Sequence, residues 1–119
     1  MSAPAWVGVA LLGGVGAAAR FLVDGAISER VSSALPWGTL AVNVSGSAAL
    51  GALVGASLHG DALTLAGTAT IGSYTTFSTW MFETHRLAEQ GQRRAAALNV
   101  VVSLAAGLAA AAIARALAG

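Results

Sequence analysis

The sequence predicts an all-α integral membrane protein, with four transmembrane helices in a single domain that spans residues 1–119. Composition is the first reason, because 56% of the residues are hydrophobic and only 9% are charged. Soluble domains carry about 25% charged residues, so this chain has too little polar surface to stay dissolved. Length is the second reason, because each apolar stretch reaches the length of about 20 residues that a helix needs to cross a bilayer core.

The four spans are expected at 6–27, 37–58, 62–83 and 95–118. A polar connection at 28–33 leads to Pro36. Proline suits the start of a helix, because it has no backbone N–H and the first N–H groups of a helix have no intrahelical acceptor. A tight turn at 59–61 precedes the third span, and a charged loop at 85–94 precedes the fourth. Connections this short make neighbouring helices antiparallel.

Composition also excludes several functions. The chain has no cysteine, which excludes disulfides, thiolate metal sites and cysteine nucleophiles. Its net charge of +1 argues against a nucleic-acid partner, which would require clustered cations. The N-terminus lacks the basic region of a secretory signal, so the first apolar stretch is expected to remain as a transmembrane helix.

The arginine positions predict the orientation. In an antiparallel arrangement the two termini and the middle loop share one face, which carries Arg115 only. The opposite face carries Arg30, Arg86, Arg93 and Arg94. Cytoplasmic loops are enriched in Lys and Arg, so the first and third loops are predicted to be cytoplasmic and both termini to lie outside.

The third span is predicted to be broken near mid-membrane, at 72–76, where Gly72 is followed by several hydroxyl residues. Lipid offers such groups no hydrogen-bond partner, so they normally face another helix or a water-filled path. We expect the helix to open at Gly72 because glycine tolerates unusual backbone angles. An opened helix would expose carbonyl groups, which are good ligands for a hard cation such as Na⁺.

Five candidate side chains follow this break. Phe77 and Trp80 lie at i and i+3, and they could either present electropositive ring edges to an anion or pack in the core. Ser78 and Thr79 could donate hydroxyl groups to an ion or bond back to the preceding turn. Glu83 lies one turn beyond Thr79 and is either an interfacial charge or part of an ion path.

Two further spans carry polar stripes at a spacing of four residues. The members of these stripes are Asn43, Ser47 and Gly51 in the second span and Asn99, Ser103 and Gly107 in the fourth. Each stripe could bond a neighbouring helix or line a path of donors. The small residues Gly51 and Gly55 could pack helices within one subunit or between subunits.

The first span contributes Arg20 and Asp24, which form either a self-neutralising pair one turn apart or a vestibule in which the arginine attracts anions. No carboxylate stands in the middle of any span, as a proton relay would require. The pattern therefore favours passive passage of a small anion.

Three motifs in order carry a family resemblance: GGVGAAAR at 13–20, GTLAVN at 38–43 and GSYTTFST at 72–79. With these motifs the chain resembles the Fluc (CrcB-type) family of small bacterial fluoride channels over essentially its whole length. The resemblance implies an antiparallel dimer of four-helix subunits in the bacterial cytoplasmic membrane, with two pores for the passive export of fluoride.

The resemblance also implies roles for individual residues. The backbone carbonyls of Gly72 and Thr75 would bind a structural, non-transported sodium ion at the dimer centre. Positions that would line the fluoride pathway are Asn43, Phe77, Ser78, Thr79, Glu83 and Ser103, with Arg20 in a vestibule. Trp80 stands where the family usually has a second phenylalanine, and Asn99 stands where many members have tyrosine. The larger Trp80 ring, with its N–H donor, could narrow or alter a pore.

Alternatives follow from the same residues. A small multidrug exporter would need an embedded glutamate in the first span, which offers only Asp24 near its end. A non-transporting structural subunit would lack the polar stripes, and no Ser-His-Asp spacing or metal-ligand cluster indicates an enzyme. The expected partners are fluoride, membrane lipid and a second subunit. That subunit is an identical copy or a homologue of opposite arginine bias. In the second case this chain would be one half of a heterodimer, and a further alternative makes it the non-conducting half.

Overall fold

The computed structural model describes residues 1–31, 33 and 35–119, and all regular structure within them is helical. Three helices are long: α1 (Ala3–Arg30), α2 (Trp37–Gly55) and α6 (Arg93–Ala118). Each of these is long and apolar enough to cross a membrane, judged by length and composition. The polar connection expected at 28–33 includes Ser32, which lies outside the described residues, and α1 itself continues to Arg30.

The third expected span consists of several shorter elements. They are α3 (Gly60–Leu63), the π-helix η1 (Thr64–Ile71), α4 (Gly72–Tyr74) and α5 (Ser78–Glu89). The π-helical stretch was not predicted, and its wider turn shows in the Thr70 hydroxyl, which donates to the Leu65 carbonyl five residues back at 2.7 Å. Thr75 then takes an extended conformation, with ψ of 164°, before α5 begins.

The prediction that the backbone opens at Gly72 is wrong. Gly72 has helical angles, φ −60° and ψ −37°, and the helical path continues through Tyr74. The physical reason is that hydrogen bonds support the chain up to Thr75, whose backbone N–H and hydroxyl both donate to Ile71 O, at 2.9 and 3.1 Å. The extended conformation begins only at Thr75, where support comes from another helix.

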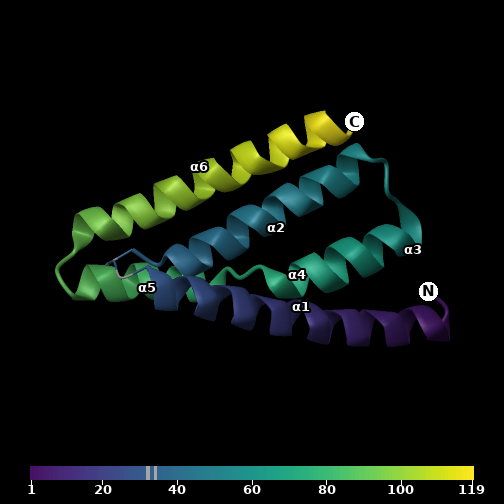
Figure 1. The fold of residues 1–119 in the computed structure, drawn as a ribbon, viewed down its shortest axis with the longest axis horizontal. Coiled ribbons are helices and arrows are strands. Elements are labelled where there is room, and N and C mark those ends of the chain that lie inside the picture. The colour runs from purple at the N-terminus through teal and green to yellow at the C-terminus, as the bar shows by residue number, and fades with distance from the viewer. Residues whose placement is uncertain (32, 34) are drawn as a thin grey trace.

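The helices run alternately up and down, and both termini lie at the same end as the turn between α2 and α3 (Figure 1). Two glycines let α2 and α6 approach closely. A Cβ atom at Gly51 would collide with the backbone carbonyl of Ala111 in α6, and one at Gly55 with the carbonyl of Arg115. The small-residue motif of α2 therefore packs two helices within this chain.

The helix α1 packs on η1 and α4 through one glycine. Gly16 is buried, and a Cβ there would collide with the Ser73 hydroxyl and the Thr70 carbonyl. These contacts hold α1 beside η1 and α4 (Figure 1). The packing places the extended residues after α4 between α1 and α2, which positions the site described below.

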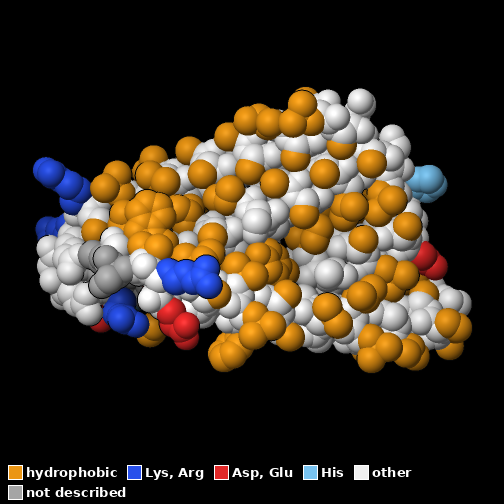
Figure 2. Space-filling model, viewed as in Figure 1, with side chains coloured by type: hydrophobic (Ala, Val, Ile, Leu, Met, Phe, Trp, Pro, Cys, Tyr) orange, Lys and Arg blue, Asp and Glu red, His pale blue; other side chains and the backbone are white. Residues whose placement is uncertain are grey.

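The outer surface of the bundle is apolar. Large side chains such as Phe21, Leu11 and Leu108 are 77%, 66% and 68% exposed, whereas Val42 is fully buried. Figure 2 shows hydrophobic side chains spread along the molecule and charged side chains gathered toward its ends. An apolar middle with charged ends is the surface expected of a protein surrounded by lipid.

Candidate functional site

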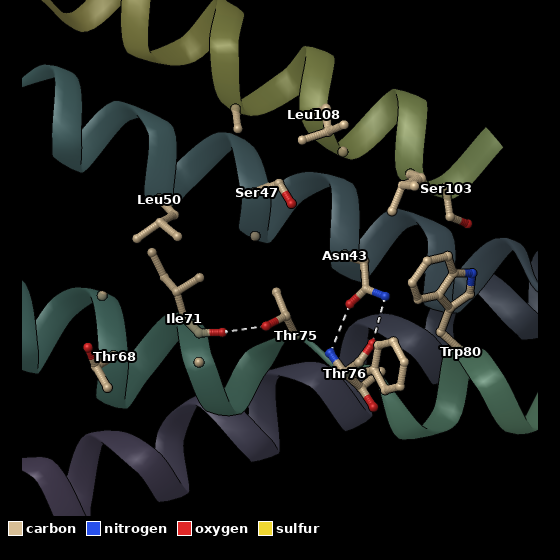
Figure 3. A pocket seen from close by; sticks show the side chains of 17 residues that line it. Asn43, Ser47, Leu50, Thr68, Ile71, Thr75, Thr76, Trp80, Ser103 and Leu108 are labelled. Atoms are coloured by element: carbon tan, nitrogen blue, oxygen red, sulfur yellow. Dashed lines mark hydrogen bonds between the residues drawn. The ribbon is translucent and has the colours of Figure 1, made fainter. Parts of the chain in front are cut away.

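The Asn43 side chain holds the short connection between α4 and α5 in place. Its amide nitrogen donates to the Thr76 carbonyl at 2.8 Å, and its amide oxygen accepts from the Thr76 N–H at 2.8 Å (Figure 3). These two bonds satisfy both backbone groups of Thr76 after it leaves the helix. A second hydrogen on the Asn43 nitrogen stays free, because a primary amide has two.

A cavity of about 520 Å³ lies beside this contact, between α2, α6 and the segment that runs from η1 to α5 (Figure 3). Hydroxyl, amide, glycine and aromatic residues share its wall with a few leucines. The predicted site residues that line it are Asn43, Gly72, Thr75, Phe77, Trp80 and Ser103. The structure therefore brings six of the predicted residues, from three separate segments, to one hollow.

Two aromatic rings stand at one end of the cavity. Phe77 and Trp80 meet edge to face, with ring centroids 5.8 Å apart and planes at 86°. Phe77 is 69% exposed within the single chain, whereas Trp80 is half-buried. The rings therefore pack on each other and also line the hollow, and the alternative that their edges meet an anion stays a prediction.

The indole N–H of Trp80 does not point freely into the cavity. It donates to the backbone carbonyl of Asn99 at 3.1 Å. Asn99 is buried in α6, is absent from the cavity wall, and donates its side-chain amide to the Thr84 hydroxyl at 2.8 Å. Asn99 thus joins α6 to α5, the helix-bonding alternative for its stripe, while Ser103 one turn later lines the cavity.

A smaller hollow of about 280 Å³ lies on the other side of Thr76. Arg20, Asp24 and Thr79 line it, and Thr76 borders both hollows. Within the described part of the chain no ion pair joins Arg20 to Asp24, and the Asp24 carboxylate instead accepts from the Ser28 hydroxyl at 3.2 Å. Arg20 therefore makes no contact ion pair with Asp24, although both side chains lie on the wall of the same hollow.

The remaining predicted residues lie apart. Glu83 borders a third hollow, of about 210 Å³, together with Arg86. One carboxylate oxygen of Glu83 and the hydroxyl of Thr39 are buried without a hydrogen-bond partner in the described chain. Ser78 is exposed and lines none of these three hollows.

Sequence analysis missed two side chains, Thr39 and Thr84, and did not foresee the bonding role of the Thr76 backbone. Thr84 could have been found from its spacing, because it lies one helical turn after Trp80 and its hydroxyl bonds back to the Trp80 carbonyl at 2.9 Å. Thr39 lies one turn before Asn43 on the same face of α2, and that spacing was the only signal for it.

A family model described as "CrcB-like protein, Camphor Resistance (CrcB)" matches residues 7–115 of the chain. The chain belongs to this family. The family resemblance inferred from the three sequence motifs is thereby confirmed.

Similar proteins carry a consistent name. The "Fluoride-specific ion channel FluC 2" of Mycolicibacterium paratuberculosis is 59% identical over 113 residues, which cover 95% of this chain and 93% of that protein. The protein of the same name from Mycobacterium bovis is 54% identical over 106 residues, covering 89% and 84%. The "Fluoride-specific ion channel FluC 1" of Nocardia farcinica is 52% identical over 101 residues, covering 84% and 71%.

The relatives bear on two coarse predictions. They are named as ion channels, so the prediction that this CrcB-like chain is not an enzyme is confirmed by its family. With three helices long and apolar enough to cross a bilayer, the family also supports a multi-pass membrane protein.

Proposed function

We propose that this chain is a subunit of a passive, fluoride-selective channel that lets fluoride leave the cytoplasm across the bacterial cell membrane. The observation that carries the proposal is a cavity in an apolar bundle whose mainly apolar wall carries one amide and several hydroxyl groups, in a chain 59% identical to a protein named as a fluoride-specific ion channel. Passive passage fits because none of the described residues that line this cavity is titratable.

The cavity offers fluoride the groups that it needs. Fluoride is small and holds its water strongly, so donors must replace that water along the path. The free amide hydrogen of Asn43 and the hydroxyl of Ser103 are such donors on the cavity wall. The ring edges of Phe77 and Trp80 add weak positive potential in the same hollow.

The hollow around Thr76 supplies an approach. Arg20 raises the positive potential there, and the Thr79 hydroxyl lies on the same wall. Because Thr76 borders both hollows, an anion gathered near Arg20 would pass the extended backbone before it reaches Asn43. Ser78 begins α5 and Glu83 lies further along it, toward its charged end, and roles of both in the pathway are part of the proposal.

A structural sodium ion is the second part of the proposal. Gly72 and Thr75 border the cavity, and no N–H or O–H group bonds to their carbonyl oxygens in the described chain. Bare carbonyl oxygens are suitable ligands for a hard cation, so these residues fit such an ion. A bound cation would supply a fixed positive charge that favours an anion nearby.

Thermal unfolding tests the sodium ion. We expect the melting temperature to rise when sodium replaces N-methylglucamine at constant chloride. A ligand at 100 times its Kd adds about 2.7 kcal/mol to the stability of the folded state. An unfolding curve that does not respond to sodium would contradict the site.

An antiparallel dimer is the third part. The cavity is open in the single chain, and Phe77 and Leu108 on its wall are largely exposed, at 69% and 68%. A second copy would cover these side chains and close the hollow. Antiparallel insertion of identical copies requires balanced loops, whereas Arg30, Arg86, Arg93 and Arg94 crowd one face.

The arginine bias favours one specific alternative, in which this chain pairs with a homologous subunit of opposite bias. Single cysteines at Ser2 and Gly119 can test it cleanly, because the chain has no cysteine of its own. Equal labelling from both sides of the membrane supports the homodimer. Labelling from one side only supports the heterodimer.

Fluoride efflux tests the channel itself. Liposomes that contain only this purified chain are followed with a fluoride electrode, and chloride efflux is measured in parallel. Fast fluoride efflux without chloride efflux is expected, and Ser103→Ala should slow it, whereas Thr64→Val, outside the cavity wall, should not. If fluoride stays inside, the homologous subunit is added, and no efflux from that mixture would refute the channel.

A further inference from the structure

Three hydrogen bonds form a closed ring between α5 and α6. The Trp80 indole N–H donates to the Asn99 carbonyl at 3.1 Å, and the Asn99 side-chain amide donates to the Thr84 hydroxyl at 2.8 Å. The Thr84 hydroxyl then donates to the Trp80 carbonyl at 2.9 Å. The set of three hydrogen bonds therefore begins at the Trp80 side chain and ends at the Trp80 backbone.

The chemistry of the groups fixes the direction of each bond. An indole has one N–H and no acceptor, so Trp80 can only donate. Thr84 has one hydroxyl hydrogen, which it gives to the Trp80 carbonyl, so its oxygen must accept from Asn99. Asn99 is 5% exposed, and a buried amide that lost this partner would leave a donor unsatisfied.

This ring of bonds decides what Trp80 presents to the cavity. Trp80 lies on the cavity wall beside Phe77, while Asn99 lies behind it and off the wall. Because the single indole N–H is already bonded to Asn99, it cannot also be offered to an ion. The carbon edge and face of the ring are left toward Phe77 and the hollow.

We propose that Thr84 and Asn99 are positioning residues, which hold the Trp80 ring in one orientation and keep its N–H out of the ion path. The inference rests on the proposed channel function for its consequence, which is a path of defined width at Trp80. A free indole would rotate, open the path and add a donor that any anion could use. The held ring favours the smaller anion over the larger one.

The first arm of the test is spectroscopic and needs no transport. With Trp6 and Trp37 replaced by phenylalanine, Trp80 is the only tryptophan, and its indole N–H gives one nitrogen–proton NMR signal. We expect a single signal that exchanges slowly with water. In Thr84→Val the exchange should be about fivefold faster, the population change that loss of one ordinary hydrogen bond produces.

Matched variants separate the ring of bonds from a general loss of structure. Thr84→Ser keeps the hydroxyl and should restore the slow signal, and Thr84→Ala serves as a second deletion if the valine variant does not fold. Thr64→Val removes another hydroxyl that bonds back to the preceding turn, to Gly60 at 3.2 Å, but it has no partner on another helix. That variant should leave the Trp80 signal unchanged.

The second arm is transport, measured as the ratio of fluoride to chloride efflux. Thr84→Val should lower this ratio by about fivefold, because the freed indole N–H becomes a donor that either anion can use. In a Trp80→Phe background the same substitution should change the ratio by less than about twofold, because no N–H remains to be held.

Each outcome has one meaning. An unchanged Trp80 signal in both deletion variants overturns the positioning role. A changed signal with an unchanged efflux ratio overturns its consequence for selectivity. If the unaltered chain moves no fluoride, alone or with its homologue, the channel proposal fails, while the NMR arm still decides whether Thr84 holds the ring.

Discussion

Replacement of Asn43 by leucine is the sharpest test of how the extended backbone is held. Leucine has the same branched shape, although it is larger, and can neither donate nor accept, so both 2.8 Å bonds to Thr76 are lost. A buried backbone group without a partner costs about 1–3 kcal/mol. Since Asn43 and Thr76 are only half-buried, we expect the pair of losses to lower the free energy of unfolding by about 2–3 kcal/mol.

Replacement by aspartate separates the two bonds. A carboxylate can still accept from the Thr76 N–H but cannot donate to the Thr76 carbonyl, so Asn43→Asp should be destabilised by less than Asn43→Leu. Its negative charge on the cavity wall should nevertheless stop fluoride efflux. Stability and transport are therefore expected to rank the two variants differently.

The assays are reversible unfolding in detergent, followed by circular dichroism, and fluoride efflux from liposomes. Ser47→Ala is the matched stability control, because Ser47 lies one turn along the same wall and its hydroxyl makes no hydrogen bond in the described chain. The control should change the free energy of unfolding by less than about 0.5 kcal/mol. A leucine variant as stable as this control, with normal efflux, would refute the reasoning.

Four further substitutions have expected outcomes. Gly51→Val should lower stability in the same unfolding assay by about 1–3 kcal/mol, because its side chain would collide with the Ala111 backbone. Gly13→Ala, with open space around the new Cβ, should not, and equal losses would contradict the packing. Phe77→Ala should abolish fluoride efflux while lowering the stability of the single chain by only about 0.5–1.5 kcal/mol, because the ring is 69% exposed and loses mainly its edge-to-face contact with Trp80. Arg20→Gln should slow efflux most at low ionic strength, and a loss independent of salt would argue against attraction at a distance.

Much of the fold could be predicted from the order of apolar and polar residues. The first, second and fourth spans correspond to α1, α2 and α6 because each is a long apolar run between polar connections. The detailed structure of the third expected span could not be predicted. Its hydroxyl residues support a π-helical stretch through bonds such as Thr70 to Leu65, and no pattern of apolar spacing reports such a register.

The site shows the same division. Asn43, Phe77 and Ser103 could be selected as polar or aromatic residues in apolar spans, where such groups need a partner or a function. The partner itself could not be selected. That Asn43 bonds the Thr76 backbone, and that Thr84 completes the bonds around Trp80, depends on contacts between segments 15 and 33 residues apart.

The sequence by itself determined that this chain is a helical membrane protein of the CrcB-like family, because composition, span length and three motifs are properties of the chain alone. Only the tertiary structure decided where the helical path ends and which donors remain free. A hydrogen bond uses up a donor only when its acceptor lies within about 3 Å, and that distance is set by how helices pack. For this reason the Asn43 amide is bonded to Thr76 and still lines the cavity, while the N–H of Trp80 is bonded to Asn99.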